Sequence, residues 1–114
     1  MLTKRMIEIN FQAAKNDAKK LEEAAEHLER LAKGQYEEVM QGISKSWKSD
    51  SAPEYIRKGR KVENDMQNTA KELKTLASQI RQAAQRMYNA EMQALEIANV
   101  RTSGGGGGGG GGSW

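Results

Sequence analysis

The chain has no cysteine, one proline and few aromatic residues, and these shortages exclude several classes of protein. Without cysteine there is no disulfide framework and no thiolate chemistry. Aromatic residues make up only 5% of the 114 residues, so a sheet sandwich with a large aromatic core is not expected, whereas 29% charged residues suit helices with wet surfaces. No run approaches the roughly 18 apolar residues of a membrane-spanning helix. Residues 1–6 also lack the apolar stretch of roughly 7–15 residues that makes a secretory signal, so no cleavable signal peptide is expected.

The residues that enzymes and metal sites need are also scarce. His27 is the single histidine, whereas a zinc site needs at least three converging ligands. No Ser/His/Asp set is present, and the run Gly104–Gly112 is not a phosphate-binding loop, because no strand precedes it and no helix follows it. The sequence therefore predicts a protein that is not an enzyme and that has no metal site and no cofactor.

The formal net charge is +3, and the excess lies in the second half of the chain. Arg57, Lys58, Arg60 and Lys61 form its densest basic cluster, with acidic residues close by. A nucleic-acid-binding protein needs a larger basic stripe with aromatic residues that stack on bases. We therefore expect a solvated helix face here and no nucleic-acid partner.

Apolar residues recur three and four positions apart in two long stretches, about 10–46 and 51–101. This spacing keeps them on one face of a helix for several turns. The predicted fold is all-α: an antiparallel two-helix hairpin over residues 10–101, with a turn at about 45–51. The following residues represent the predicted core and dimer seam: Phe11, Leu21, Leu28, Val39, Ile43, Val62, Met66, Leu73, Leu76 and Ile80.

The ends of the first helix are predicted from local patterns. Ile7, Ile9 and Phe11 alternate, which is typical of an extended segment, so residues 1–9 are predicted as a lead-in and Asn10 as the N-cap. Gly34 and Gly42 weaken the helix interior, and a kink or frayed end is expected near Gly42.

The second helix has a clear predicted start and a glycine-rich stretch after it. Ser51-Ala-Pro-Glu54 has the form of a capping box, with proline in the first turn. The helix is predicted to end near residue 100 or 101. Residues 102–114 are predicted as a flexible tail, because nine glycines lose the most backbone entropy on ordering. The tail is either an artificial linker or a natural feature.

One hairpin presents only one apolar stripe, and a domain this small buries little surface. No disulfide or metal is predicted to compensate. Further apolar residues, such as Ala24, Leu31 and Leu95, widen the stripe beyond what two helices need. The sequence therefore predicts a dimer in which two hairpins form a four-helix bundle.

A two-helix chain of about this length with Trp47, Lys48 and Ser49 in the turn resembles the WXG family of early-secreted-antigen-like proteins. The third motif position is usually glycine in that family and is Ser49 here. The late segment 86–92 also resembles the family, although its usual tyrosine-plus-acid spacing of four is not met. A looser pattern, a hydrophobic residue four before an acid, is met by Met87 and Glu91.

The resemblance implies a small protein exported folded, as a dimer, by a type VII secretion system and acting by protein–protein binding. Its expected partners are a second copy or a paralogous WXG-like chain, the secretion machinery, and a larger secreted effector. Met87, Tyr88 and Glu91 would form the export signal, with Tyr88 and Glu91 facing outward beside the seam. The expected location is outside the cell, after a cytoplasmic stage.

Two alternatives remain open at the level of sequence. The chain could be an intracellular adaptor that pairs with a larger effector and lends it an export signal. It could also be a structural coiled-coil module with no secretion role. Trp47 either fills the end of the bundle or also docks a partner helix.

Overall fold

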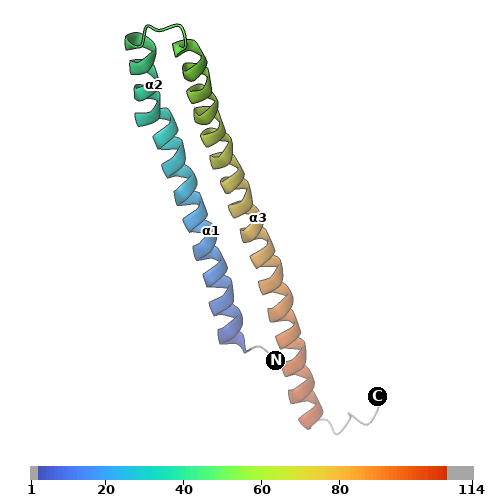
Figure 1. The fold of residues 1–114 in the computed structure, drawn as a ribbon. Coiled ribbons are helices and arrows are strands. Elements are labelled where there is room, and N and C mark those ends of the chain that lie inside the picture. Colours follow the sequence, from blue (N-terminus) through green and yellow to red (C-terminus); the bar gives the residue numbers. More distant parts are fainter. Residues whose placement is uncertain (1–2, 108–114) are drawn as a thin grey trace. The chain divides into compact units, whose positions relative to one another are not determined.

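The computed structural model describes residues 3–107, with side chains described for residues 3–101, and this part of the chain is helical without a strand. Helix α1 spans Lys4–Lys33, α2 spans Gln35–Ser46 and α3 spans Ala52–Gly107 (Figure 1). The all-α class predicted from the spacing of apolar residues is confirmed. None of the described helices is both long enough and apolar enough to cross a membrane.

The chain divides into two compact units, which are described separately. The middle unit is Asp17–Gln79, and the terminal unit combines Met1–Asn16 with Ile80–Trp114. In the middle unit, Glu29 contacts Lys74 and Tyr36 contacts Gly59, so α3 runs opposite to α1 and α2 there. In the terminal unit, Phe11 of α1 contacts Tyr88 of α3.

The predicted extended lead-in with an N-cap at Asn10 is wrong, because α1 already begins at Lys4. The Thr3 hydroxyl accepts a hydrogen bond from the Met6 amide at 3.2 Å, which is how an N-cap threonine satisfies a free amide of the first turn. Ile7, only 2% exposed, anchors this first part of the helix. Ile7 and Phe11 are four residues apart and therefore lie on the same helix face.

The interruption of the first helical stretch lies at Gly34, whereas Gly42 lies inside α2. At Gly34 the backbone dihedrals are φ −102° and ψ −98°, outside the helical values. A Cβ atom there would lie 2.8 Å from the Arg30 carbonyl oxygen, so a side chain would force the backbone to move. At Gly42 a Cβ would meet nothing within 4 Å, and the helix continues through it.

Residues 47–51 connect α2 to α3, inside the range where the turn is predicted. The Trp47 amide donates to the Ile43 carbonyl at 2.9 Å and closes α2. The Ser51 hydroxyl lies 3.4 Å from the Ser49 hydroxyl, and the Glu54 carboxylate pairs with Lys58 at 3.3 Å. These contacts differ from the predicted capping box, because Glu54 turns along its own helix toward a lysine four residues on.

Alanines, rather than large apolar side chains, form the buried row of the middle unit. Ala18, Ala25 and Ala32 of α1 and Ala70 and Ala77 of α3 are all 0% exposed. Glu29 of α1 pairs with Lys74 of α3. Because the two helices run in opposite directions, the positions one helical turn to either side of this pair place Ala25 opposite Ala77 and Ala32 opposite Ala70. Small side chains on both helices allow their backbones to approach closely, so this row is where the helices of the middle unit meet.

Three of the ten residues of the predicted seam are exposed. Val39, Val62 and Leu76 are 58%, 48% and 45% exposed. The other seam residues are partly buried: Phe11, Leu21, Leu28, Ile43, Met66, Leu73 and Ile80. Alanine contributes little to a hydropathy pattern, so on α3 the larger Val62 and Leu76 were selected for the seam, although the fully buried residues beside them are Ala70 and Ala77.

Helix α3 extends to Gly107, beyond the predicted end near residue 101. The remainder of the predicted tail, 108–114, lies outside the described residues.

Candidate functional site

Large apolar side chains lie on the surface of the middle unit and are its clearest candidate for an interaction site. Six of them are between 37% and 58% exposed: Leu31, Val39, Trp47, Tyr55, Val62 and Leu76. On α3, Val62 immediately precedes the buried Glu63, and Leu76 immediately precedes the buried Ala77. Since successive helix residues are about 100° apart, Val62 and Leu76 lie on a face that the alanine contact does not cover. This face is exposed to solvent in the middle unit.

The turn carries an exposed aromatic pair. The rings of Trp47 and Tyr55 stack with centroids 5.6 Å apart, and both side chains remain exposed, by 40% and 53%. Lys58 Nζ lies 5.2 Å from the centre of the Tyr55 ring. Trp47 is therefore held against the start of α3 while part of its ring faces solvent. This arrangement suits both predicted roles of Trp47, which are filling the end of the bundle and docking a partner helix.

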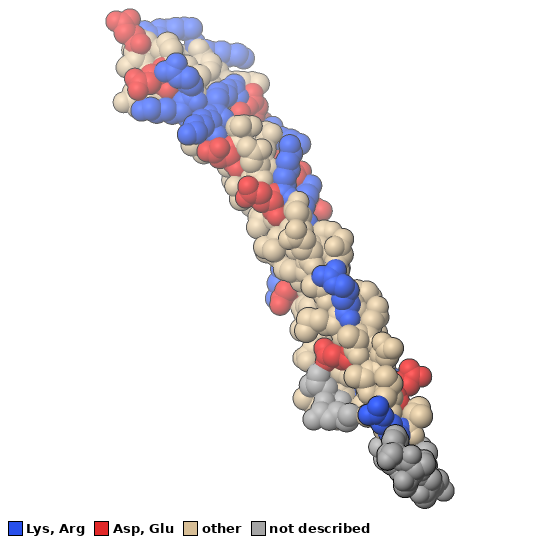
Figure 2. Space-filling model, turned by 90° about the vertical axis from the view of Figure 1, so that its right-hand side faces the viewer, with Lys and Arg blue, Asp and Glu red and all other residues tan. Residues whose placement is uncertain are grey.

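Basic residues gather in the part of the middle unit that carries the turn. Figure 2 shows lysine and arginine side chains gathered over the part of the middle unit near the turn, with acidic side chains among them. Lys58 pairs with Glu54, and Arg60 pairs with Glu37 and Glu63. The predicted solvated basic face is thus partly neutralised by the protein's own carboxylates.

Glu37, Arg60 and Glu63 form a charged cluster between α2 and α3. The Arg60 Nη1 group donates to the Glu37 carboxylate and, at 2.9 Å, to Glu63 Oε1. Glu63 is only 8% exposed, and its second oxygen, Oε2, has no hydrogen-bond partner among the described residues. Hydrogen bonding to the Glu63 carboxyl and to the Arg60 guanidinium lowers the pKa of Glu37, and both carboxylates raise the pKa of Arg60. The cluster joins α2 to α3.

Next to this cluster, α2 approaches α3 at a glycine. The Tyr36 hydroxyl donates to the Gly59 carbonyl oxygen at 2.8 Å. A Cβ atom on Gly59 would lie 2.6 Å from the end of the Met40 side chain, which is 4% exposed. The absence of a side chain at Gly59 therefore gives Met40 its buried position.

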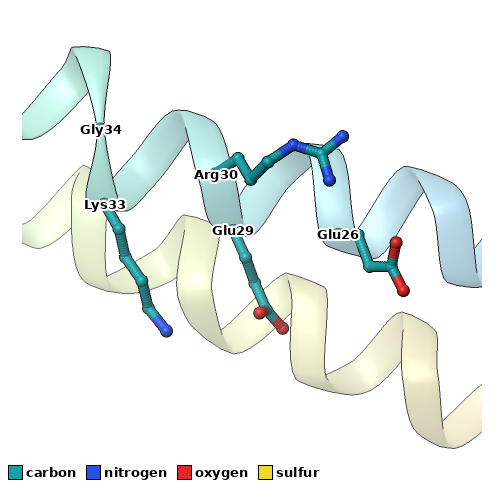
Figure 3. A pocket seen from close by; sticks show the side chains of 5 residues that line it. All are labelled: Glu26, Glu29, Arg30, Lys33 and Gly34. Carbon is teal, nitrogen blue, oxygen red and sulfur yellow. The ribbon is translucent and has the colours of Figure 1, made fainter.

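A hollow beside Gly34 is lined by charged residues of α1. Figure 3 shows Glu29 and Lys33 directed toward α3 and Arg30 directed away from it. Glu29 pairs with Lys74 Nζ at 2.6 Å, and this hydrogen bond lowers the pKa of Glu29. Because Glu29 is already paired within the chain, its main role is to join α1 to α3.

The predicted export-signal residues lie in the terminal unit and do not share one exposed face. Met87 is 62% exposed, whereas Tyr88 and Glu91 are partly buried. The Tyr88 ring stacks on Phe11, with centroids 4.5 Å apart and an interplanar angle of 30°. The expectation that Tyr88 and Glu91 both face outward is therefore wrong, because Tyr88 gains aromatic contact with α1.

Several residues that shape these sites were not selected from the sequence. Ile7 lines a small cavity with Tyr88 and Glu91, and its spacing of four before Phe11 is the sequence feature that indicates this. Glu63 follows Val62 on the apolar side of the second stretch. From sequence alone, however, a glutamate is expected to be exposed to solvent. Its partners include Glu37, far away in the sequence, and no local pattern indicates that contact.

No known family model, no curated protein and no solved structure matches this chain. The resemblance to the WXG family rests on the sequence alone: its length, its two-helix pattern, the turn and the late segment.

Proposed function

We propose that the chain is an antiparallel helical hairpin that acts by binding other proteins and not by catalysis. In this proposal it resembles WXG-type substrates: it pairs with a second copy or a paralogous chain as a four-helix bundle and is exported folded by a type VII secretion system. The main support is the pattern of burial in the middle unit. Val39, Val62 and Leu76 are about half exposed, while the row of alanines is fully buried: Ala18, Ala25, Ala32, Ala70 and Ala77.

The exposed apolar side chains favour pairing for a thermodynamic reason. Removing apolar surface from water contributes roughly 25 cal/mol per Å², so covering several large side chains stabilises an assembly. Contiguous apolar surface that the protein's own fold leaves uncovered is typical of protein-binding sites. A second hairpin would supply a matching face, since each copy carries the same uncovered residues.

The dimer is tested by placing a charge on the exposed face. We expect wild type to scatter light as a dimer at micromolar concentration and Leu76→Asp to scatter as a helical monomer, because a dimer would bury the new carboxylate. Ser78→Asp, two residues away and also exposed, is the matched control and should remain dimeric. A wild-type monomer that unfolds cooperatively, or a dimeric Leu76→Asp, would reject this pairing surface.

Export is tested separately from pairing. The chain should accumulate in the culture supernatant of a host with an active type VII system and not in that of a derivative whose system is inactivated. Co-expression with the product of the neighbouring gene distinguishes the adaptor alternative, in which the chain leaves the cell only together with that partner. A chain retained in the cell under all these conditions would leave a structural coiled-coil module as the explanation.

A further inference from the structure

The segment around the connection between α2 and α3 carries more positive charge than the chain as a whole. Residues 45–61 contain six lysine or arginine residues and two acidic residues, a balance of +4, whereas the full chain has a net charge of +3. Two of the six, Lys58 and Arg60, are paired with glutamates of the chain. The other four, the tip cations, are exposed and form no ion pair within the part of the chain that the structure describes: Lys45, Lys48, Arg57 and Lys61.

The tip cations do not share one face. Arg57 and Lys61 lie two residues to either side of Gly59, where a Cβ atom would meet Met40 of α2. Helix residues two apart differ by about 200°, so Arg57 and Lys61 lie on the side of α3 that faces away from α2. Lys45 belongs to α2 and Lys48 to the connection. Long basic side chains spread in this way can bend toward a flat surface at the turn, whereas a helical partner polypeptide docks on one face or in a groove.

The same segment carries the stacked pair of Trp47 and Tyr55, and both side chains are exposed. Each ring combines an apolar body with one polar group, which is why tryptophan and tyrosine are enriched where a membrane meets water. The stacking occupies one face of each ring, so the pair is less suited to stacking on the bases of a nucleic acid. An anionic bilayer offers negative charge to the tip cations and an interfacial layer to the two rings.

We propose that the turn end of the middle unit binds the surface of a bilayer that contains anionic lipids. Trp47 and Tyr55 enter the layer between the headgroups and the acyl chains, and the tip cations contact lipid phosphates around them. The protein lies on the membrane through this site and does not span it. The site consists of residues 45–61 alone, so it depends neither on pairing nor on export.

The test uses the full chain with Trp114→Phe, which leaves Trp47 as the single tryptophan. Vesicles of equal parts phosphatidylglycerol and phosphatidylcholine should co-sediment the chain and shift Trp47 emission to shorter wavelength. Vesicles of phosphatidylcholine alone should do neither, and added salt should weaken binding because it screens exposed charges. Soluble glycerophosphoglycerol, the same headgroup without acyl chains, should leave the emission unchanged. An equal shift with this compound would assign the site to a free phosphate ester and reject the bilayer.

Two matched pairs of substitutions locate the site. Each basic residue near an anionic surface strengthens binding about fivefold, so Lys48→Gln with Lys61→Gln should weaken vesicle binding about 25-fold. Lys19→Gln with Lys20→Gln removes the same charge from exposed lysines of α1 and should leave binding unchanged. Circular dichroism checks that both variants retain the fold. Equal weakening by the two pairs, or binding without a shift of Trp47 emission, would overturn the proposal. Polyglutamate that binds as tightly as the vesicles would assign the surface to an acidic polypeptide and also reject it.

Discussion

Replacing Ala25 by leucine should destabilise the protein, whereas the same change at Ala24 should not. Ala25 is 0% exposed in the alanine row, and Ala24, its neighbour in α1, is exposed. Alanine and leucine have similar helix propensities, so propensity does not separate the two variants. The difference between them therefore reports the space available at each position.

The size of the effect follows from the packing. Leucine adds three carbon atoms at a position that has no free surface and that lies opposite Ala77. Extra methylene groups in a filled core typically cost about 1–3 kcal/mol, while exposed substitutions stay within about 0.5 kcal/mol. For a domain of this size, 1 kcal/mol shifts the melting temperature by roughly 4–8 °C. Ala25→Leu should therefore melt roughly 4–24 °C below wild type.

The assay is thermal and urea unfolding of the full chain, followed by circular dichroism at several protein concentrations, because pairing also contributes to apparent stability. A double-mutant cycle with Ala77→Gly then asks whether the two positions touch. The glycine should cost less in the Ala25→Leu background than in wild type, since it opens space for the leucine. Equal stability of Ala25→Leu and Ala24→Leu would refute the alanine contact, and strict additivity in the cycle would refute the pairing of Ala25 with Ala77.

Three further changes test other contacts. Tyr36→Phe removes the hydrogen bond to a main-chain carbonyl on α3 and should cost about 1 kcal/mol in urea unfolding; no change would mean that water replaces it. The pKa of Glu37 is lowered below its ordinary value of 4.5. The ionised Glu37 side chain therefore stabilises the fold at pH values above 4.5, and this stabilisation is lost as the pH falls through the pKa of the folded state. Acid titration of the melting temperature should show this loss in wild type and less of it in Glu37→Gln, and identical curves would contradict it. Tyr88→Ala should lower the melting temperature more than Met87→Ala, since only Tyr88 stacks on α1; equal values would show that the stacking contributes nothing.

The helical class was predictable because steps of three and four persist over many turns, and scarce proline leaves them uninterrupted. The face of contact was harder to predict, because Ala70 and Ala77 contribute little hydropathy although they are fully buried, while the more hydrophobic Val62 and Leu76 are exposed. Three alternating residues from Ile7 also cannot distinguish an extended segment from the start of a helix.

The candidate sites were less predictable than the fold, because they depend on contacts between distant parts of the chain. Tyr88 is beside the expected seam in sequence, and only the position of Phe11 on α1 shows that it turns inward. Glu63 would likewise be predicted as a surface residue from sequence, and only its contacts with Arg60 and Glu37 show that it is buried. Partner residues brought together by folding determine which charges are buried, and local spacing does not contain that information.

The alanine row has a consequence for the alignment of the two sides of the middle unit. Its members recur every seven residues, at Ala18, Ala25 and Ala32 on one side and Ala70 and Ala77 on the other. Sliding one side by seven residues would again place alanine against alanine, so the row alone does not distinguish the two registers. The Glu37–Arg60–Glu63 cluster has no such repeat, and a slip would separate Arg60 from Glu37 and leave charges without partners. We infer that these polar contacts select one register, as a single polar position does in a coiled coil. The alanines supply close packing, which is compatible with more than one register.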